Sequence, residues 1–138
     1  MINKNNTIII LFILMGILTR VIPHPPNMTA IGAIALFGGA FFQDRRLAFA
    51  VPILTMLMSD FILGYQLNIA VYMSFIGIVF LGFTIKAKQT ISRVFNTSIL
   101  ASLIFFIITN FSVFLYSPLY PNNIIGLLEC YTLAIPFF

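Results

Sequence analysis

The sequence predicts an all-α integral membrane protein, a helical bundle with five transmembrane helices and a short, incomplete C-terminal helix. Hydrophobic residues make up 61% of the 138 residues and charged residues only 7%, whereas a soluble domain carries about 25% charged residues. The apolar residues form continuous runs, without the alternation that a membrane barrel requires. The charged residues gather at the ends of these runs. The apolar surplus is therefore expected to face lipid.

Six apolar segments, joined by short loops, are expected to form one transmembrane domain over residues 1–138. The five expected spans are 7–22, 29–42, 47–64, 69–85 and 97–116. The first resembles a signal peptide, but no small-residue cleavage site follows it, so we expect an uncleaved helix. The sixth segment, 124–138, is only 15 residues long and contains Glu129 and Pro136. We expect it to be interfacial or re-entrant rather than a true span.

The positions of lysine and arginine predict the orientation of these segments. If the loops alternate between two sides, one side receives six of the seven basic residues. These six are Lys4, Arg45, Arg46, Lys86, Lys88 and Arg93. The opposite side has only Arg20, inside the end of the first segment. Because basic loops stay in the cytoplasm, the N-terminus and the loops 43–46 and 86–93 are expected to be cytoplasmic in a cell (inner) membrane. The net charge of +4 is thus explained by topology and not by binding to nucleic acid.

The few polar residues within the apolar segments all fall toward the non-cytoplasmic side. Burying an ionisable residue in lipid costs about 2.5–3.5 kcal/mol on insertion scales, so such residues are usually paired, solvated or functional. One interpretation is an outward-facing substrate-binding pocket with tyrosine walls. Its candidate residues are Arg20, His24, Asn27, Asp60, Asn110 and Glu129, with Tyr65, Tyr72, Tyr116 and Tyr120 as walls. The alternative is an Arg20–Asp60 salt bridge with tyrosines in the usual interfacial belt.

These alternatives predict different effects of Asp60→Asn. In a binding pocket, the substitution should alter ligand binding more than folding. In a structural ion pair it should mainly destabilise, because Arg20 loses its partner in a low dielectric.

A face of small residues in the second segment offers a separate signal. Gly32, Ala35 and Gly39 fall at i, i+3 and i+7, on one side of a helix, and Ala35 and Gly39 form a small-xxx-small pair. Such pairs let membrane helices approach closely. The face therefore indicates either packing inside the bundle or an interface with a partner membrane subunit.

No enzyme motif is present in the sequence. H-E-x-x-H, G-x-S-x-G and P-loop patterns are all missing. One histidine and one cysteine do not suffice for a dedicated zinc site, so we expect no enzyme activity, resident metal or cofactor. Cys130 is expected to be a small packing residue. If the protein moves a solute uphill, the energy must come from ion coupling or a separate ATPase.

Several motifs resemble an uncharacterised bacterial membrane family of putative transport proteins. They are R-x-x-P-H-P-P-N at 20–27, A-L-F-G-G-A at 35–40, D-R-R at 44–46, S-D-x-x-L-G at 59–64, I-T-N-F at 108–111 and C-Y-x-x-A-I-P-F at 130–137. That family is in turn similar in size and pattern to the S components of energy-coupling-factor transporters. The resemblance implies six membrane helices and an outward-facing pocket for a small molecule, a vitamin-like compound or a metal ion. It also implies a transmembrane T component and cytoplasmic ATPases as partners.

One departure from this family, and one alternative function, remain open. Members of the family continue past P-F-F with a polar turn and another helix, whereas this chain stops at Phe138. A truncated chain or an early end is expected, which leaves the sixth helix incomplete. The alternative is a structural membrane subunit similar to a rod-shape protein of cell-wall elongation, suggested by the small-residue face. A third hypothesis, an intramembrane enzyme using Asp60 or Glu129, has no motif to support it.

Overall fold

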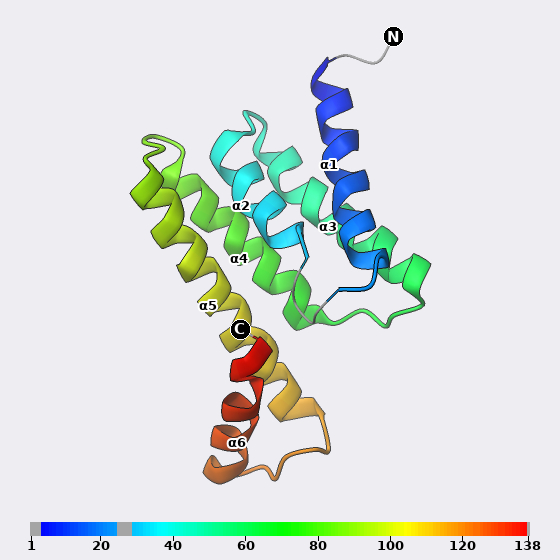
Figure 1. Cartoon of the computed structure of the whole chain (residues 1–138), viewed down its shortest axis with the longest axis vertical. Helices are drawn as coiled ribbons and strands as arrows, with labels where there is room; N and C mark the ends of the chain where they lie inside the picture. The colour runs from blue at the N-terminus through cyan, green and yellow to red at the C-terminus, as the bar shows by residue number, and fades with distance from the viewer. Residues whose placement is uncertain (1–3, 25–28, 138) are drawn as a thin grey trace.

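The computed structural model describes residues 4–24 and 29–137, and within them it is all-helical (Figure 1). The helices are α1 (Lys4–Val21), α2 (Ile31–Phe41), α3 (Arg45–Leu63), α4 (Ile69–Ile85), α5 (Ile91–Tyr116) and α6 (Ile124–Ala134), followed by the 3₁₀ turn η1 (Ile135–Phe137). No strand occurs among the described residues. The all-α prediction is thus confirmed.

Four of the five helix starts after α1 are fixed by side-chain caps. Asp44, Asn68, Thr90 and Asn123 each accept a hydrogen bond from a backbone N–H in the first turn of the next helix, which satisfies a donor that the helix leaves free. The cap at Thr90 explains a difference from the sequence prediction. The fifth span was expected to start at residue 97 after a basic loop over 86–93, whereas residues 91–96 form the first turns of α5, so Arg93 lies on a helix.

Helices α2, α3 and α4 form the centre of the molecule, with α1 packed mainly on α3 and α5 mainly on α4. The largest cluster of buried apolar residues lies here and comprises Ile31, Ala35, Leu36, Ala48, Met56, Phe75, Ile78, Val79 and Ala101. The contact between α2 and α4 is closest where Gly39 meets Gly82. A Cβ added at either glycine would collide with the backbone of the other helix, so two glycines are needed for this approach.

Helix α5 continues beyond the α2–α4 centre, and its C-terminal half packs with α6 (Figure 1). Apart from η1, α6 contacts no described element other than α5. Figure 1 also shows that consecutive helices run in opposite directions. The starts of α1 and α3 and the turn between α4 and α5 lie toward one end, and the 64–68 turn lies at the other.

Two helices, α3 and α5, are long and apolar enough to cross a membrane. Four further apolar helical stretches are shorter: Thr7–Val21, Ile31–Phe41, Ile69–Ile85 and Ile124–Phe137. Helix α2 in particular has 11 residues and is about 16 Å long at 1.5 Å per residue, about half the thickness of the hydrocarbon core. The helix lengths therefore support two crossings and not the five that the sequence predicted.

Candidate functional site

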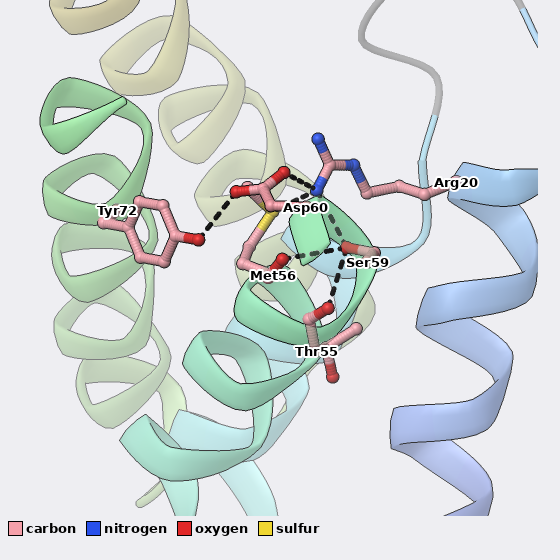
Figure 2. Close-up of polar contacts among 6 residues, drawn as sticks. All are labelled: Arg20, Thr55, Met56, Ser59, Asp60 and Tyr72. Atoms are coloured by element: carbon pink, nitrogen blue, oxygen red, sulfur yellow. Dashed lines mark hydrogen bonds and ion pairs between the residues drawn. The ribbon is translucent and has the colours of Figure 1, made fainter. Parts of the chain in front are cut away.

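The centre of the candidate site is an ion pair between α1 and α3. Arg20 Nη1, near the end of α1, lies 2.5 Å from Asp60 Oδ1 near the end of α3. The two side chains are only 15% and 5% exposed. Figure 2 shows Arg20 reaching from α1 across to Asp60. The salt bridge that the sequence offered as an alternative is therefore present in the structure.

Two further side chains of α3 hold the same nitrogen of Arg20. Nη1 donates to Ser59 Oγ at 2.8 Å and approaches Met56 Sδ at 3.4 Å. The Ser59 hydroxyl is fully buried and also donates back to its own helix, at the carbonyl of Thr55. The guanidinium is thus anchored by three groups from one face of α3, which fixes its position more firmly than a single ion pair would.

A tyrosine from α4 completes the coordination of the carboxylate. The Tyr72 hydroxyl donates to Asp60 Oδ2 at 2.6 Å, so both oxygens of Asp60 are engaged (Figure 2). Asp60 of α3 therefore links α1 to α4. The link is strong because hydrogen bonds to a charged group are stronger than neutral ones. No buried side-chain nitrogen or oxygen lacks a partner among the described residues.

The turn after α3 brings an aromatic ring beneath the arginine. Gly64 has φ 68°, in the left-handed region that glycine adopts without strain. The chain reverses there, and the backbone N–H of Tyr65 donates to the carbonyl of Asp60 at 2.9 Å. The Tyr65 ring centroid then lies 5.7 Å from the guanidinium carbon of Arg20, within the range of a cation–π contact.

A cavity of about 740 Å³ lies beside this network. Arg20, His24 and Tyr65 contribute polar groups at the end of α1 and the turn after α3. Thr29 before α2 and Ser98 and Ser102 of α5 add further hydroxyls, and Asp60 is not part of the lining. Most of the wall is apolar or aromatic. It includes Gly32, Ala33 and Leu36 of α2, Val71, Phe75 and Ile78 of α4, Ala101, Phe105 and Phe106 of α5, and Pro136 and Phe137 of η1. A mostly apolar wall with a small number of polar groups is typical of small-molecule sites, and the volume falls within their usual range.

The structure brings together only part of the predicted substrate-binding set. Arg20 and Asp60 are in contact, and His24 lines the cavity with its Nδ1 2.7 Å from the carbonyl of Ile22. Asn27 lies outside the described residues. Asn110 and Glu129 do not line the cavity.

Asn110 and Glu129 belong to the α5–α6 pair instead. The Asn110 side chain donates to Phe106 O of its own helix at 2.8 Å, and its backbone carbonyl accepts from Cys130 Sγ at 3.5 Å. Glu129 is exposed on α6 and forms no ion pair within the described part of the chain. The reason is that α6 packs beside the C-terminal half of α5, so its side chains do not reach the end of α3.

The tyrosines expected to form walls also divide into two groups. Tyr65 lines the cavity and Tyr72 binds Asp60. Tyr116 is 84% exposed and Tyr120 lies in the loop between α5 and α6, so neither reaches the Arg20 site.

The small-residue face of α2 is mostly occupied within the chain. Ala35 is fully buried, and Gly39 packs against Gly82 of α4, as the internal-packing interpretation expects. Gly32 differs, because it lines the cavity and a Cβ there would meet nothing within 4 Å. The partner-subunit interpretation of this face stays a prediction.

Sequence reasoning missed Ser59 and Met56 as partners of Arg20. One signal was available for Met56, since it precedes Asp60 by four residues and so shares its helix face. The phenylalanines of the cavity wall had no such signal, because Phe75 and Phe105 are two of 16 phenylalanines in the chain.

The whole sequence, residues 1–138, matches a Family of unknown function (DUF6580), and the chain belongs to that family. No curated protein and no solved structure shows a significant match.

Proposed function

We propose that this chain is a multi-pass membrane protein that binds a small molecule from the outer side, as the substrate-binding subunit of a transporter resembling an energy-coupling-factor S component. The observation that carries the proposal is the cavity, whose mostly apolar wall includes the anchored Arg20 as its one arginine or lysine among the described lining residues. The sequence lacks a P-loop. Energy for uphill uptake would therefore come from a separate T component and ATPases.

The exposed surface supports a membrane environment. Large apolar side chains are exposed along every α-helix, including Phe61 at 89% on α3 and Ile91 at 91% on α5. A soluble protein rarely exposes contiguous apolar patches of such extent. With only 7% charged residues in the chain, lipid is the solvent that such a surface fits.

The length of α2 is compatible with five crossings if the second crossing is partly non-helical. Non-helical backbone is tolerated at membrane depth where it lines a cavity. His24 and Thr29, which precede α2, both line the cavity. We therefore propose that residues 29–42 form the second crossing, with the C-terminal helix α6 near the outer surface.

Charge supports the proposed orientation. The ends of the helices that carry Lys4, Arg45 and the basic 86–90 turn lie on the same side of the molecule in Figure 1. Lys86 Nζ donates to Phe42 O, at the C-terminal end of α2, at 2.6 Å, where a cation is favoured by the helix dipole. The positive-inside rule assigns this side to the cytoplasm and the Arg20 site to the outer half.

Orientation is tested by single-cysteine labelling in a Cys130→Ser background. Gln66→Cys in the α3–α4 turn should react with a membrane-impermeant maleimide in intact cells. Lys88→Cys should react only after permeabilisation. Both native side chains are exposed, so the folded protein permits either reaction. The reverse pattern would overturn the orientation, and equal labelling of both in intact cells would overturn the membrane topology.

Binding is tested by a thermal-shift screen of the purified protein with vitamins, nucleobases and small organic acids. We expect at least one class to stabilise the wild type and to lose its effect in Gly32→Leu, which places a side chain in the cavity. Thr132→Leu adds similar bulk on the exposed face of α6 and should leave the shift unchanged. If no compound acts, or if Gly32→Leu binds like the wild type, the cavity is not the ligand site.

The structural-subunit alternative has less support. Its motive was the small-residue face of α2, and two of those three residues, Ala35 and Gly39, pack inside this chain. Affinity purification that recovered cell-wall elongation proteins, with no ligand found in the screen, would favour that alternative over transport.

A further inference from the structure

The guanidinium of Arg20 uses only part of its capacity to donate hydrogen bonds. All three of its acceptors, on Met56, Ser59 and Asp60, are bonded to Nη1. Nη2 and Nε donate to none of the residues in 4–24 and 29–137. In Figure 2 the dashed lines reach only one of the two terminal nitrogens of Arg20. Because a guanidinium carries five N–H donors in a planar fork, the described part of the chain leaves an edge of this fork free for another molecule.

Arg20 itself borders the cavity, whereas Asp60 is not part of the cavity lining. A ligand in the cavity would therefore meet the cation and not its counter-ion. The described lining residues include no aspartate or glutamate. The anchoring by Asp60 and Ser59 also fixes the guanidinium before a ligand arrives, which lowers the entropy cost of binding.

We infer that the ligand, within the function proposed above, is a small organic monoanion whose carboxylate accepts from the free edge of Arg20. Carboxylates match the planar fork of arginine with two parallel hydrogen bonds. The body of the ligand lies along the aromatic wall formed by Phe75 and Phe105. A second negative charge would enter this apolar chamber without a partner and is disfavoured.

The same arrangement disfavours a free metal ion as the ligand. The described residues contain no group of three or more His, Cys, Asp or Glu side chains that would hold a metal. Both oxygens of Asp60 are already engaged by Arg20 and Tyr72. A cation in the cavity would face the guanidinium first, and like charges in a low dielectric repel strongly. The sequence left two ligand classes open, a vitamin-like organic compound and a metal ion, and the organic compound fits this cavity.

The test compares three molecules of similar shape that differ in charge. The probes are 1-naphthoate, 1-naphthamide and 1-naphthylmethylamine, titrated calorimetrically into the protein in phosphatidylcholine nanodiscs. We expect the acid to bind at least tenfold more tightly than the amide, and the amine not to bind. Gly32→Leu should remove binding of the acid, and Thr132→Leu should not.

A charge-balanced variant separates the effect of the Arg20 guanidinium on ligand binding from its effect on folding. Arg20→Gln combined with Asp60→Asn removes both charges together, so neither is left unpaired. The variant should still bind the amide, and its preference for the acid should fall to about one. Arg20→Lys keeps the charge and loses the fork, so it should show an intermediate preference. An undiminished preference in the double variant would overturn the assignment to Arg20.

Other outcomes distinguish this inference from the proposed function. Equal binding of acid and amide, with both sensitive to Gly32→Leu, would overturn the carboxylate and leave ligand binding in place. If none of the three probes binds, the inference of an aromatic monoanion as ligand is wrong. Whether the protein binds any ligand is decided separately by the thermal-shift screen. If the protein purified from cells retains an anionic phospholipid that Gly32→Leu loses and naphthoate does not displace, the oxyanion is a lipid phosphate and the soluble acid is wrong.

Discussion

The α1–α4 part of the molecule and the α5–α6 pair are held together in different ways. In α1–α4, a buried carboxylate links three helices and two glycines bring α2 against α4. In α5–α6, the helices are largely exposed, and they are joined by hydrogen bonds from Tyr131 and Cys130 to backbone carbonyls of α5. The stability of α1–α4 therefore depends on a few groups that no other group replaces, whereas α5–α6 should tolerate substitutions.

The largest expected difference comes from replacing an acid by its amide in each part. Asp60→Asn leaves the Arg20 guanidinium without its counter-ion in a mostly buried position, and removing one partner of a buried pair costs on the order of 3–5 kcal/mol. Glu129→Gln changes an exposed side chain and should stay within about 0.5 kcal/mol of the wild type. Unfolding of both variants by SDS in mixed micelles measures this.

The same pair of variants separates the two roles of Asp60. If Asp60→Asn keeps the stability of the wild type but loses ligand binding, Asp60 contacts the ligand directly and its position behind Arg20 is wrong. Equal losses in Asp60→Asn and Glu129→Gln would contradict the contrast between the two parts.

Glycine substitutions should give the next largest difference. Gly39→Ala places a Cβ against the backbone of Val79 and Gly82, which cannot move aside like a side chain. Overpacking of this kind costs about 1–3 kcal/mol. Gly77→Ala on α4 meets only the Ile104 side chain, at 3.8 Å, and should be neutral or slightly stabilising because alanine favours helix. Thermal unfolding in detergent compares them, and a Gly39→Ala protein as stable as Gly77→Ala would refute the close approach of α2 and α4.

Removing one hydroxyl from each part should give the smallest difference. Tyr72→Phe deletes a donor to the Asp60 carboxylate, a bond to a charged group worth about 1.5–3 kcal/mol. Tyr131→Phe deletes a 2.7 Å bond to the carbonyl of Ile107, a neutral and exposed bond worth about 1 kcal/mol or less. A double-mutant cycle of Tyr72→Phe with Asp60→Asn should show strong coupling. Additive effects would mean that the Tyr72 hydroxyl has another partner.

Local signals in the sequence located the helices well. Apolar runs and the short polar loops between them gave the order of the six helices, because each signal depends on neighbours within one or two turns. The limits differed where a cap outweighed composition, as at Thr90. The length of α2 was overestimated, since Thr29 and Ala30 are apolar enough to extend the run but precede the helix.

The candidate site was predicted only where depth along a helix was enough information. Arg20 and Asp60 were paired correctly because both lie at the same end of antiparallel neighbours. Asn110 and Glu129 were grouped with them on the same reasoning, yet they lie on the α5–α6 side, away from the cavity. The depth of a residue along its helix gives its height in the bundle but not the side of the bundle that it faces. Depth alone therefore does not distinguish residues that share a pocket from residues on opposite sides of the bundle.

The sequence by itself determined that this protein is helical, that its surface suits lipid and that its basic residues gather at one end. These properties follow from composition and from contacts within a helix. Only the tertiary structure decided that Tyr72 engages the second oxygen of Asp60, that Ser59 and Met56 hold Arg20, and that Arg20 borders a cavity. Those relations depend on how helices rotate about their axes when they pack, and close packing of distant residues fixes that rotation.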